Sequence, residues 1–282
     1  MGSCTLVDLA TAWELFRDAI VCAVLAGVVL GGLGVHVVVR RMVFASAALA
    51  EAAALGVMIG FFVEIYSGLA VPPSLTAIGV ALLAAVGLAW RPEAVSREVI
   101  LAAVWIGSAA LALVVGASIT QEAHDVAEIL LGSAVLVRPE DLWRVAGSSV
   151  FVAGAAAVLH RGLVFAGFDE ETARVHGLPV RALEVALWAL ITIQVATCTR
   201  ALGALPVFAF SVLPGAAALL WVGRLQAAFP VAAALGAVSG AGGFLLAFVF
   251  DLPVGASQAG VATALFACGM LWSRARSSAL LR

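Results

Sequence analysis

The sequence contains no lysine and has fifteen arginines. A Walker A phosphate-binding loop needs a lysine that reaches the β- and γ-phosphates of the nucleotide. The chain is therefore not expected to bind and hydrolyse ATP by that route. If ATP drives its activity, another subunit has to supply the ATPase.

Charge of either sign is also scarce. Charged residues make up 11% of the 282 residues, against 64% hydrophobic residues and a mean hydropathy of +1.15. So little polar surface cannot enclose a water-soluble core, and the composition predicts an integral membrane protein. No cleavable targeting segment is evident. The net charge of −2 gives no reason to expect a nucleic-acid partner.

Cysteine occurs at four positions only, and these lie far apart without C-x-x-C spacing. We expect small, inert apolar residues rather than disulfides or ligands for a soft metal. The four positions are Cys4, Cys22, Cys198 and Cys268.

Long apolar runs separated by charged residues or by Pro and Gly predict nine membrane spans. The weakest division is at Arg200, where a single charge separates two runs, so eight spans is an open alternative. The second of these two runs is predicted to be broken or kinked, because it contains Gly203, Pro206, Pro214 and Gly215. The fold class expected is therefore all-α, a polytopic membrane protein forming one transmembrane domain over residues 1–282. The nine runs are residues 19–39, 42–62, 73–90, 99–119, 142–159, 182–199, 201–222, 225–250 and 253–272.

Arginine is distributed unevenly between the two sets of connections. If the N-terminus lies outside, eleven arginines fall on one side and four, Arg17, Arg138, Arg144 and Arg200, on the other. By the positive-inside rule the first set is cytoplasmic, which places the C-terminus in the cytoplasm. The eleven are Arg40, Arg41, Arg91, Arg97, Arg161, Arg174, Arg181, Arg224, Arg274, Arg276 and Arg282.

Small residues crowd most of the predicted spans, as in residues 45–56 and 231–243. Small side chains let helix backbones approach closely in lipid, where no hydrophobic force draws helices together. We expect tight helix packing at these segments.

Glu51 lies almost at the centre of an uninterrupted apolar run from Met42 to Phe62. A charged group at the bilayer centre costs about 2.5 to 3.5 kcal/mol on insertion scales, so an intramembrane carboxylate indicates a functional site by default. The alternative is a protonated carboxyl group hydrogen-bonded to a neighbouring helix. Gln194 is also polar at depth and either lines a path or hydrogen-bonds another helix.

The longest cytoplasmic connection contains the sequence FDEETARVHGLP, residues 168–179, which predicts a short isolated helix. Asp169 is a good N-cap, Glu170 and Glu171 favour the positive end of the helix dipole, and Gly177 ends the helix. A helix of about two turns is not stable alone in water. It must lie on its own bundle or on a partner protein, and composition does not separate the two.

A second polar cluster, QEAHDVAE at residues 121–128, is expected in a connection on the side of the membrane opposite the cytoplasm. His124 and Glu128 are four residues apart and would share one face of a helix, so with Asp125 they are weaker candidates for a cation path or its entrance. A solvated rim is the more common explanation of such a cluster. The three other histidines, His36, His160 and His176, are expected to be packing or interface residues.

Several motifs occur together in a fixed order along the chain: RRMVF (40–44) followed by ALAEA (48–52) and Gly56, ILLGS (129–133), FDEE (168–171) with ARVHGL (173–178), LG (202–203) with LPGA (213–216), and DLPVG (251–255). The first resembles R-R-M-x-F-x-x-D-A-L-S-H-A-x-x-P-G, and the third resembles F-D-x-E-x-A-x-x-x-G-L. Both patterns belong to the membrane permeases of bacterial ABC importers for zinc, manganese and iron. The resemblance covers nearly the whole chain.

The resemblance implies a homodimer of helical permeases in the bacterial inner membrane, with two separate ATPase subunits beneath it and an extracytoplasmic protein that delivers the metal. The chain itself would be no enzyme and would bind no cofactor, because ATP is held by the partner and the metal is cargo. Residues 169–177 would be the cytoplasmic coupling helix that docks on the ATPase. Its implied coupling residues are Asp169, Glu170, Glu171, Ala173, Arg174 and Gly177.

The sequence departs from the family pattern at the metal path. Ala47 stands where the family has Asp, Glu51 where it has His, and Leu55 where it has Pro. A carboxylate in place of imidazole shifts preference from zinc toward harder cations such as manganese or ferrous iron, or gives a weaker, transient contact. One Glu51 from each subunit of a dimer would place two carboxylates on a central path.

The leading hypothesis is the permease subunit of an ABC importer that moves a divalent metal ion by alternating access. One alternative changes the cargo to an iron chelate or a cobalamin-like molecule. Another is an ion-coupled secondary carrier in which Glu51 relays protons or cations.

Overall fold

The computed structural model describes residues 6–69, 71–89, 95–119 and 137–280, and over these ranges the secondary structure is helical, with no strand. The all-α fold class is confirmed. The helices are α1 (Leu6–Val39), α2 (Val43–Ser67), α3 (Pro73–Ala89), α4 (Arg97–Ala117), α6 (Pro139–Phe168), α7 (Glu170–Val175), α8 (Val180–Leu202), α9 (Ala204–Trp221), α10 (Leu225–Phe250) and α11 (Val254–Leu280).

Each of the nine predicted spans corresponds to one of these helices. Eight of them are long and apolar enough to cross a membrane. The exception is α3, whose 17 residues extend for about 25 Å at 1.5 Å per residue and lie at the lower limit of the length that crosses a membrane. Within the described ranges the structure therefore supports eight full spans and one shorter apolar helix.

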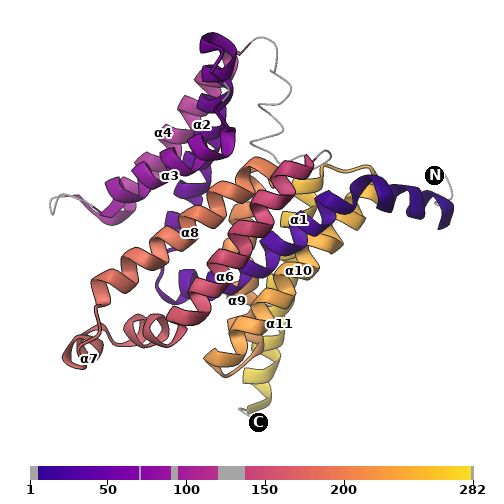
Figure 1. The fold of residues 1–282 in the computed structure, drawn as a ribbon. Helices are drawn as coiled ribbons and strands as arrows, with labels where there is room; N and C mark the ends of the chain where they lie inside the picture. The colour runs from indigo at the N-terminus through magenta and orange to yellow at the C-terminus, as the bar shows by residue number, and fades with distance from the viewer. Residues whose placement is uncertain (1–5, 70, 90–94, 120–136, 281–282) are drawn as a thin grey trace.

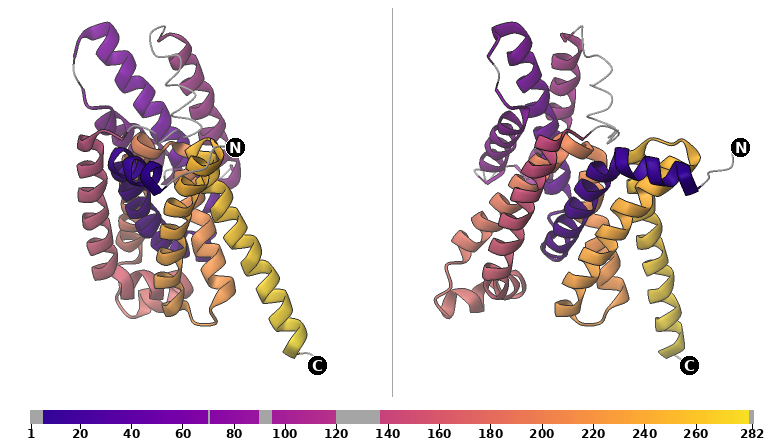
Figure 2. Two further views of the ribbon diagram at one scale, coloured as in Figure 1. Left: turned by 90° about the vertical axis from the view of Figure 1, so that its right-hand side faces the viewer. Right: turned by 45° about the vertical axis from the view of Figure 1, so that its right-hand side comes forward.

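The long helices alternate in direction, and this places α7 and the C-terminal end of α11 at the same end of the molecule (Figure 1). In the turned views the start of α1 lies well away from that end (Figure 2). Helices α2, α3 and α4 pack against one another, whereas α1 packs mainly on α10 and α9, and α11 lies against α9 and α10. Helix α8 contacts both groups, through α2 and α3 on one side and α1 and α6 on the other.

Crossings between these helices depend on glycine. A Cβ atom on Gly27 of α1 would lie 2.6 Å from the carbonyl carbon of Gly236 of α10, and one on Gly34 would lie 2.7 Å from the carbonyl oxygen of Ser211 on α9. Between α2 and α3, a Cβ atom on Gly56 would approach the Cα atom of Ala77 to 2.6 Å. The prediction that small residues allow tight helix packing is confirmed at these crossings.

The weakest predicted division falls at a glycine. Helix α8 continues through Arg200 to Leu202, and Gly203 then adopts φ 94° and ψ 163° before α9 begins. That conformation is essentially restricted to glycine. Helix α9 continues as one helix through Pro214, so the interruption predicted for this run lies ahead of the helix rather than within it.

Apolar side chains also cover much of the outer surface. On α6, the exposed fractions are 75% for Val150 and 84% for Val158, and Trp143 is exposed on the same helix. Hydrocarbon, unlike water, accommodates such a face without penalty, as expected for membrane-spanning helices.

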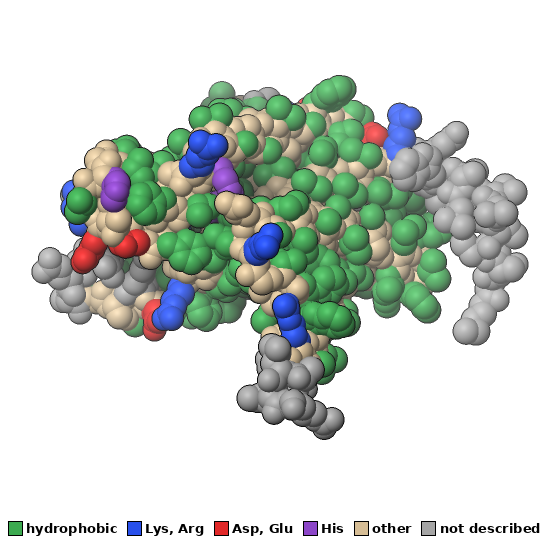
Figure 3. Space-filling model, turned by 90° about the horizontal axis from the view of Figure 1, so that it is seen from below, with side chains coloured by type: hydrophobic (Ala, Val, Ile, Leu, Met, Phe, Trp, Pro, Cys, Tyr) green, Lys and Arg blue, Asp and Glu red, His purple; other side chains and the backbone are tan. Residues whose placement is uncertain are grey.

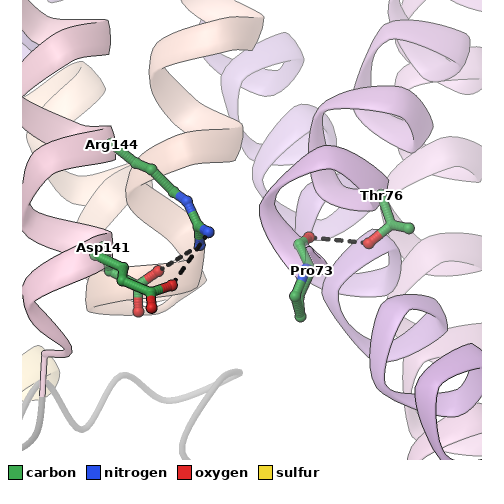
Figure 4. Close-up of polar contacts among 5 residues, drawn as sticks. Pro73, Thr76, Asp141 and Arg144 are labelled. Atoms are coloured by element: carbon green, nitrogen blue, oxygen red, sulfur yellow. Dashed lines mark hydrogen bonds and ion pairs between the residues drawn. The ribbon is translucent and has the colours of Figure 1, made fainter. Parts of the chain in front are cut away.

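Two of the four arginines predicted to face outward form ion pairs with carboxylates of their own helix. Arg144 of α6 bonds Asp141 at 3.2 Å and Glu140 at 3.4 Å, and Figure 4 shows the Asp141 contact near the first turn of the helix. Arg17 bonds Asp18 at 3.3 Å.

Candidate functional site

Glu51 lies on α2, eight residues after Val43, where this helix begins. That distance is about 12 Å along the axis, so Glu51 lies in the N-terminal half of the helix, one turn before its midpoint at Leu55. The sequence run from 42 to 62 placed it centrally because the end of the helix extends beyond that run to Ser67. Almost every α2 residue around Glu51 is buried, chiefly alanine.

Glu51 carries a carboxylate on a part of α2 that is otherwise mostly buried and apolar. Its side chain is half-buried, and its Oε2 atom is buried without a hydrogen-bond partner. Ala47 and Leu55 lie one turn away on either side and offer no ligand atoms. A buried acceptor without a donor is energetically unfavourable, and a bound cation would satisfy it.

Within the described residues, Glu51 is not part of a cluster of metal-ligating side chains. Among the residues that the structure describes, no three His, Cys, Asp or Glu side chains are grouped closely enough to hold a metal ion. A cation at Glu51 would therefore complete its shell with water, backbone oxygens or ligands from another chain. Such a site is suited to passage rather than to storage.

Two serines near Glu51 were not singled out from the sequence. Ser46 on α2 and Ser211 on α9 are buried and share a short hydrogen bond between their hydroxyl groups. Ser211 Oγ also donates to the carbonyl oxygen of Phe208 at 2.8 Å. The only signal in the sequence is a hydroxyl within an apolar helix, which is too common to point to a site. The pair fixes α2 against α9 close to Glu51.

Gln194 is fully buried on α8 and joins neighbouring groups rather than Glu51. Its Nε2 donates to Ser149 Oγ on α6 at 3.0 Å and approaches Cys198 Sγ at 3.2 Å. Of the two roles considered for Gln194, the hydrogen bond to a neighbouring helix is confirmed. Its Oε1 atom has no partner. The path role finds no support in these contacts.

The remaining polar candidates have different outcomes. The cluster with His124, Asp125 and Glu128 lies outside the described residues. His36 and His160 both pack on the ring of Phe229, with centroid distances of 4.8 Å and 4.7 Å. Packing roles for these two histidines are thereby confirmed.

The predicted short helix forms as α7, and its ends are stabilised as expected. Asp169 Oδ1 accepts a hydrogen bond from the Thr172 amide at 2.9 Å, and hydrogen bonds from Thr172 lower the pKa of the Asp169 carboxyl group. At the other end Gly177 adopts φ 78°, and the Leu178 amide donates to the carbonyl oxygen of Ala173 at 3.1 Å. Together with the bond from the Gly177 amide to the Arg174 carbonyl oxygen, this is a Schellman motif.

Helix α7 presents a mixed apolar and charged surface. Ala173 is fully buried against the rest of the protein, whereas Val175 is 85% exposed and Phe168, just before the helix, is 65% exposed. Glu170 and Arg174 form an ion pair on the exposed side. The end of the molecule that carries α7 displays arginine, acidic and histidine side chains among apolar ones (Figure 3).

Known proteins are similar to this chain in sequence and in fold. The family model of the ABC 3 transport family matches residues 12–273. The manganese transport system membrane protein MntC of Halalkalibacterium halodurans is 26% identical over 268 residues, covering 94% of this chain and 90% of that protein. The manganese import system permease protein ScaB of Streptococcus parasanguinis is 25% identical over 253 residues, covering 88% of this chain and 87% of its own length.

Among solved structures, PsaBC from Streptococcus pneumoniae in complex with Fab has a TM-score of 0.84 at 20% identity, covering 94% of this chain and 95% of the matched chain. A metal-chelate type ABC transporter in an inward-facing conformation has a TM-score of 0.71 at 16% identity, covering 96% and 91%. At these identities the structural matches show the fold. The family model spans nearly the whole chain and confirms the resemblance drawn from the motifs, so the chain belongs to the ABC 3 transport family.

Proposed function

We propose that this chain is the permease subunit of an ABC importer for a divalent metal ion, with manganese as the first candidate. The observation that carries the proposal is Glu51, a carboxylate with one buried, unpartnered oxygen in an otherwise apolar helix of an ABC 3 family fold. The names of the relatives MntC and ScaB, which state manganese transport, support the choice of metal.

The chemistry of Glu51 favours a hard cation over zinc. Carboxylate oxygens suit manganese, magnesium and calcium, whereas imidazole suits zinc. In a homodimer the two Glu51 carboxylates would face one central path and would hold the ion loosely. Alternating access would then expose this path first to an extracytoplasmic metal-binding protein and later to the cytoplasm.

Energy would come from separate ATPase subunits, since the chain has no lysine for a Walker A loop. We assign docking of the ATPase to residues 169–177, with Val175 and Phe168 as apolar contacts and Glu170, Glu171 and Arg174 as charged ones. Ala173 and Gly177 would shape the helix. Under this assignment α7 and the C-terminus would lie on the cytoplasmic side of a bacterial inner membrane, in line with the arginine bias.

The test is reconstitution of the chain in proteoliposomes with its cognate ABC ATPase subunit. We expect a stable complex, ATP-dependent manganese uptake, and loss of most uptake in Glu51→Gln with complex formation retained. Failure to form the complex would overturn the proposal. So would transport by this chain alone under a pH gradient, which would establish a secondary carrier instead.

The cargo is tested with the same vesicles. Uptake of free manganese that competes with iron or zinc ions would support an ion path. Uptake of an iron chelate or a cobalamin-like molecule, without uptake of the free ion, would replace it with the alternative cargo. The match to a metal-chelate type transporter is the observation that keeps this alternative in the experiment.

A further inference from the structure

The connection between α1 and α2 is a sharp elbow with a defined backbone. Helix α1 ends at Val39 and α2 begins at Val43. The Met42 amide donates to the Val37 carbonyl oxygen at 2.8 Å, and Arg41 adopts φ 56°, a left-handed conformation that is uncommon outside glycine. The direction in which α2 leaves this elbow fixes the position of Glu51, about two turns further along.

Arg40, the first residue of the elbow, extends its side chain to the end of α6. Its Nη2 atom donates to the carbonyl oxygen of Leu163 at 2.8 Å. A Cβ atom on Gly167 would lie 3.3 Å from Arg40 Nε, so the absence of a side chain at Gly167 makes room for the guanidinium group. The Nε atom is buried and has no hydrogen-bond partner. The guanidinium group is thus held in the last turns of the helix that leads directly into α7.

Two carboxylates, one at the start of α7 and one early in α8, influence the charge of Arg40. Partial burial lowers the pKa of the Arg40 guanidinium group, and the Glu184 and Glu170 carboxylates raise it. Glu170 is the first residue of α7, and Glu184 lies in the first turns of α8, the helix that follows α7. Arg40 is therefore linked to α6, α7 and α8.

A half-buried cation is unfavourable unless its surroundings compensate it. A neutral residue could fill the same space at the end of α1 without that penalty, so the charge itself needs an explanation. Arg40 connects the elbow that orients the Glu51 helix with the segment that carries α7.

We propose that Arg40 is a positioning residue that couples movement of α7 to the α1–α2 elbow and hence to Glu51. The inference rests on the proposed function, because it assumes that the ATPase moves α7. It assigns Arg40 neither to metal binding nor to ATPase docking. When α7 and the end of α6 shift, the bond to Leu163 and the attraction of Glu170 and Glu184 draw the elbow with them.

The experiment compares Arg40→Gln and Arg40→Lys with Arg161→Gln. Arg161 is an exposed arginine on α6 near the Leu163 carbonyl group that Arg40 contacts, so its change is a matched control. Each variant is purified with its ATPase and reconstituted. We expect Arg40→Gln to assemble and to hydrolyse ATP, but to transport about tenfold fewer metal ions per ATP, within the range of coupling between distant sites. Arg40→Lys keeps the charge without the planar fork and should be intermediate. Arg161→Gln should match the unaltered complex.

A second readout does not depend on the cargo. Hydrogen exchange of residues 40–51 should change when the intact complex binds ATP, and this change should disappear in Arg40→Gln. If Arg40→Gln does not fold, Glu184→Gln leaves both Arg40 and the proposed docking residues in place, and it should lower the metal-to-ATP ratio and reduce the exchange response.

Unaltered ratios and unaltered exchange responses in the variants that assemble would overturn the role of Arg40. An unaltered complex that binds ATP and shows the exchange response, yet carries no metal, would overturn the proposed cargo and leave the Arg40 inference standing.

Discussion

Gln194 Nε2 on α8 and Ser149 Oγ on α6 form a hydrogen bond of 3.0 Å between two buried side chains. Both belong to membrane-spanning helices, and the short helix α7 lies between these two helices in the sequence. The bond therefore ties the two helices on either side of α7 together at depth.

We expect this bond to contribute modestly to stability. Interhelical side-chain bonds in membranes are worth about 0.6 kcal/mol on average and about 1.7 kcal/mol at most, since the alternative state also finds partners. A double-mutant cycle with Gln194→Leu and Ser149→Ala, followed by denaturant unfolding in detergent, should give a coupling energy in this range. Strictly additive effects would show that the bond is not formed.

The crossing of α1 and α10 should not tolerate a methyl group. In Gly27→Ala the new Cβ atom would meet the backbone of Gly236, and we expect a loss of about 1 to 3 kcal/mol from overpacking. Gly32→Ala is the matched control, because nothing lies within 4 Å of its added Cβ atom. Thermal unfolding followed by tryptophan fluorescence compares the two. Equal midpoints would argue against the close crossing.

Helix α7 should lose order at low pH. Hydrogen bonds from Thr172 hold the pKa of Asp169 below its usual value, so its contribution to α7 is complete above the usual pKa and is lost as pH falls through the lowered one. Hydrogen exchange of residues 170–178, corrected for the intrinsic effect of pH, should show α7 protected at pH 7 and less protected toward pH values of about 3.

Two variants separate the charge of Asp169 from its capping bond. Asp169→Asn keeps an N-cap acceptor but does not titrate, so protection should be largely independent of pH. Asp169→Ala should lose protection at every pH. A pH response that persists in Asp169→Asn would assign it to another group.

Metal preference should follow the ligand at position 51. Under the proposed function, Glu51→His combined with Ala47→Asp supplies a nitrogen and an oxygen one turn apart on α2. We expect the ratio of zinc to manganese uptake to rise by roughly tenfold, since imidazole suits zinc better than carboxylate does. Competition uptake in proteoliposomes measures the ratio. An unchanged ratio, with transport retained, would show that Glu51 does not set the preference.

Features that depend on local sequence could be predicted well. The apolar runs gave the membrane helices because only regular hydrogen-bonded segments are stable in hydrocarbon. Asp169 and Gly177 predicted the ends of α7 because capping is decided within a few residues. Glu51 was identified by contrast, since a single carboxylate in an apolar run is conspicuous without any knowledge of its neighbours.

Features that depend on distant segments could not be predicted. The guanidinium group of Arg40 contacts Leu163, 123 residues away, and no local pattern contains that relation. The same holds for Ser46 with Ser211. The charge of Arg200 predicts a boundary between two spans at that residue, whereas the chain turns at Gly203, where only glycine fits the backbone.

The glycines at the helix crossings have a consequence for how variation in this family is read. At Gly27, Gly34, Gly56 and Gly236 any other residue would meet backbone atoms, so natural selection should remove such substitutions as strictly as it would remove a lost ligand. Invariance at these four positions would record the geometry of contact between helices. A search for transport residues that ranks positions by invariance alone would therefore select them first, although they do not touch the cargo.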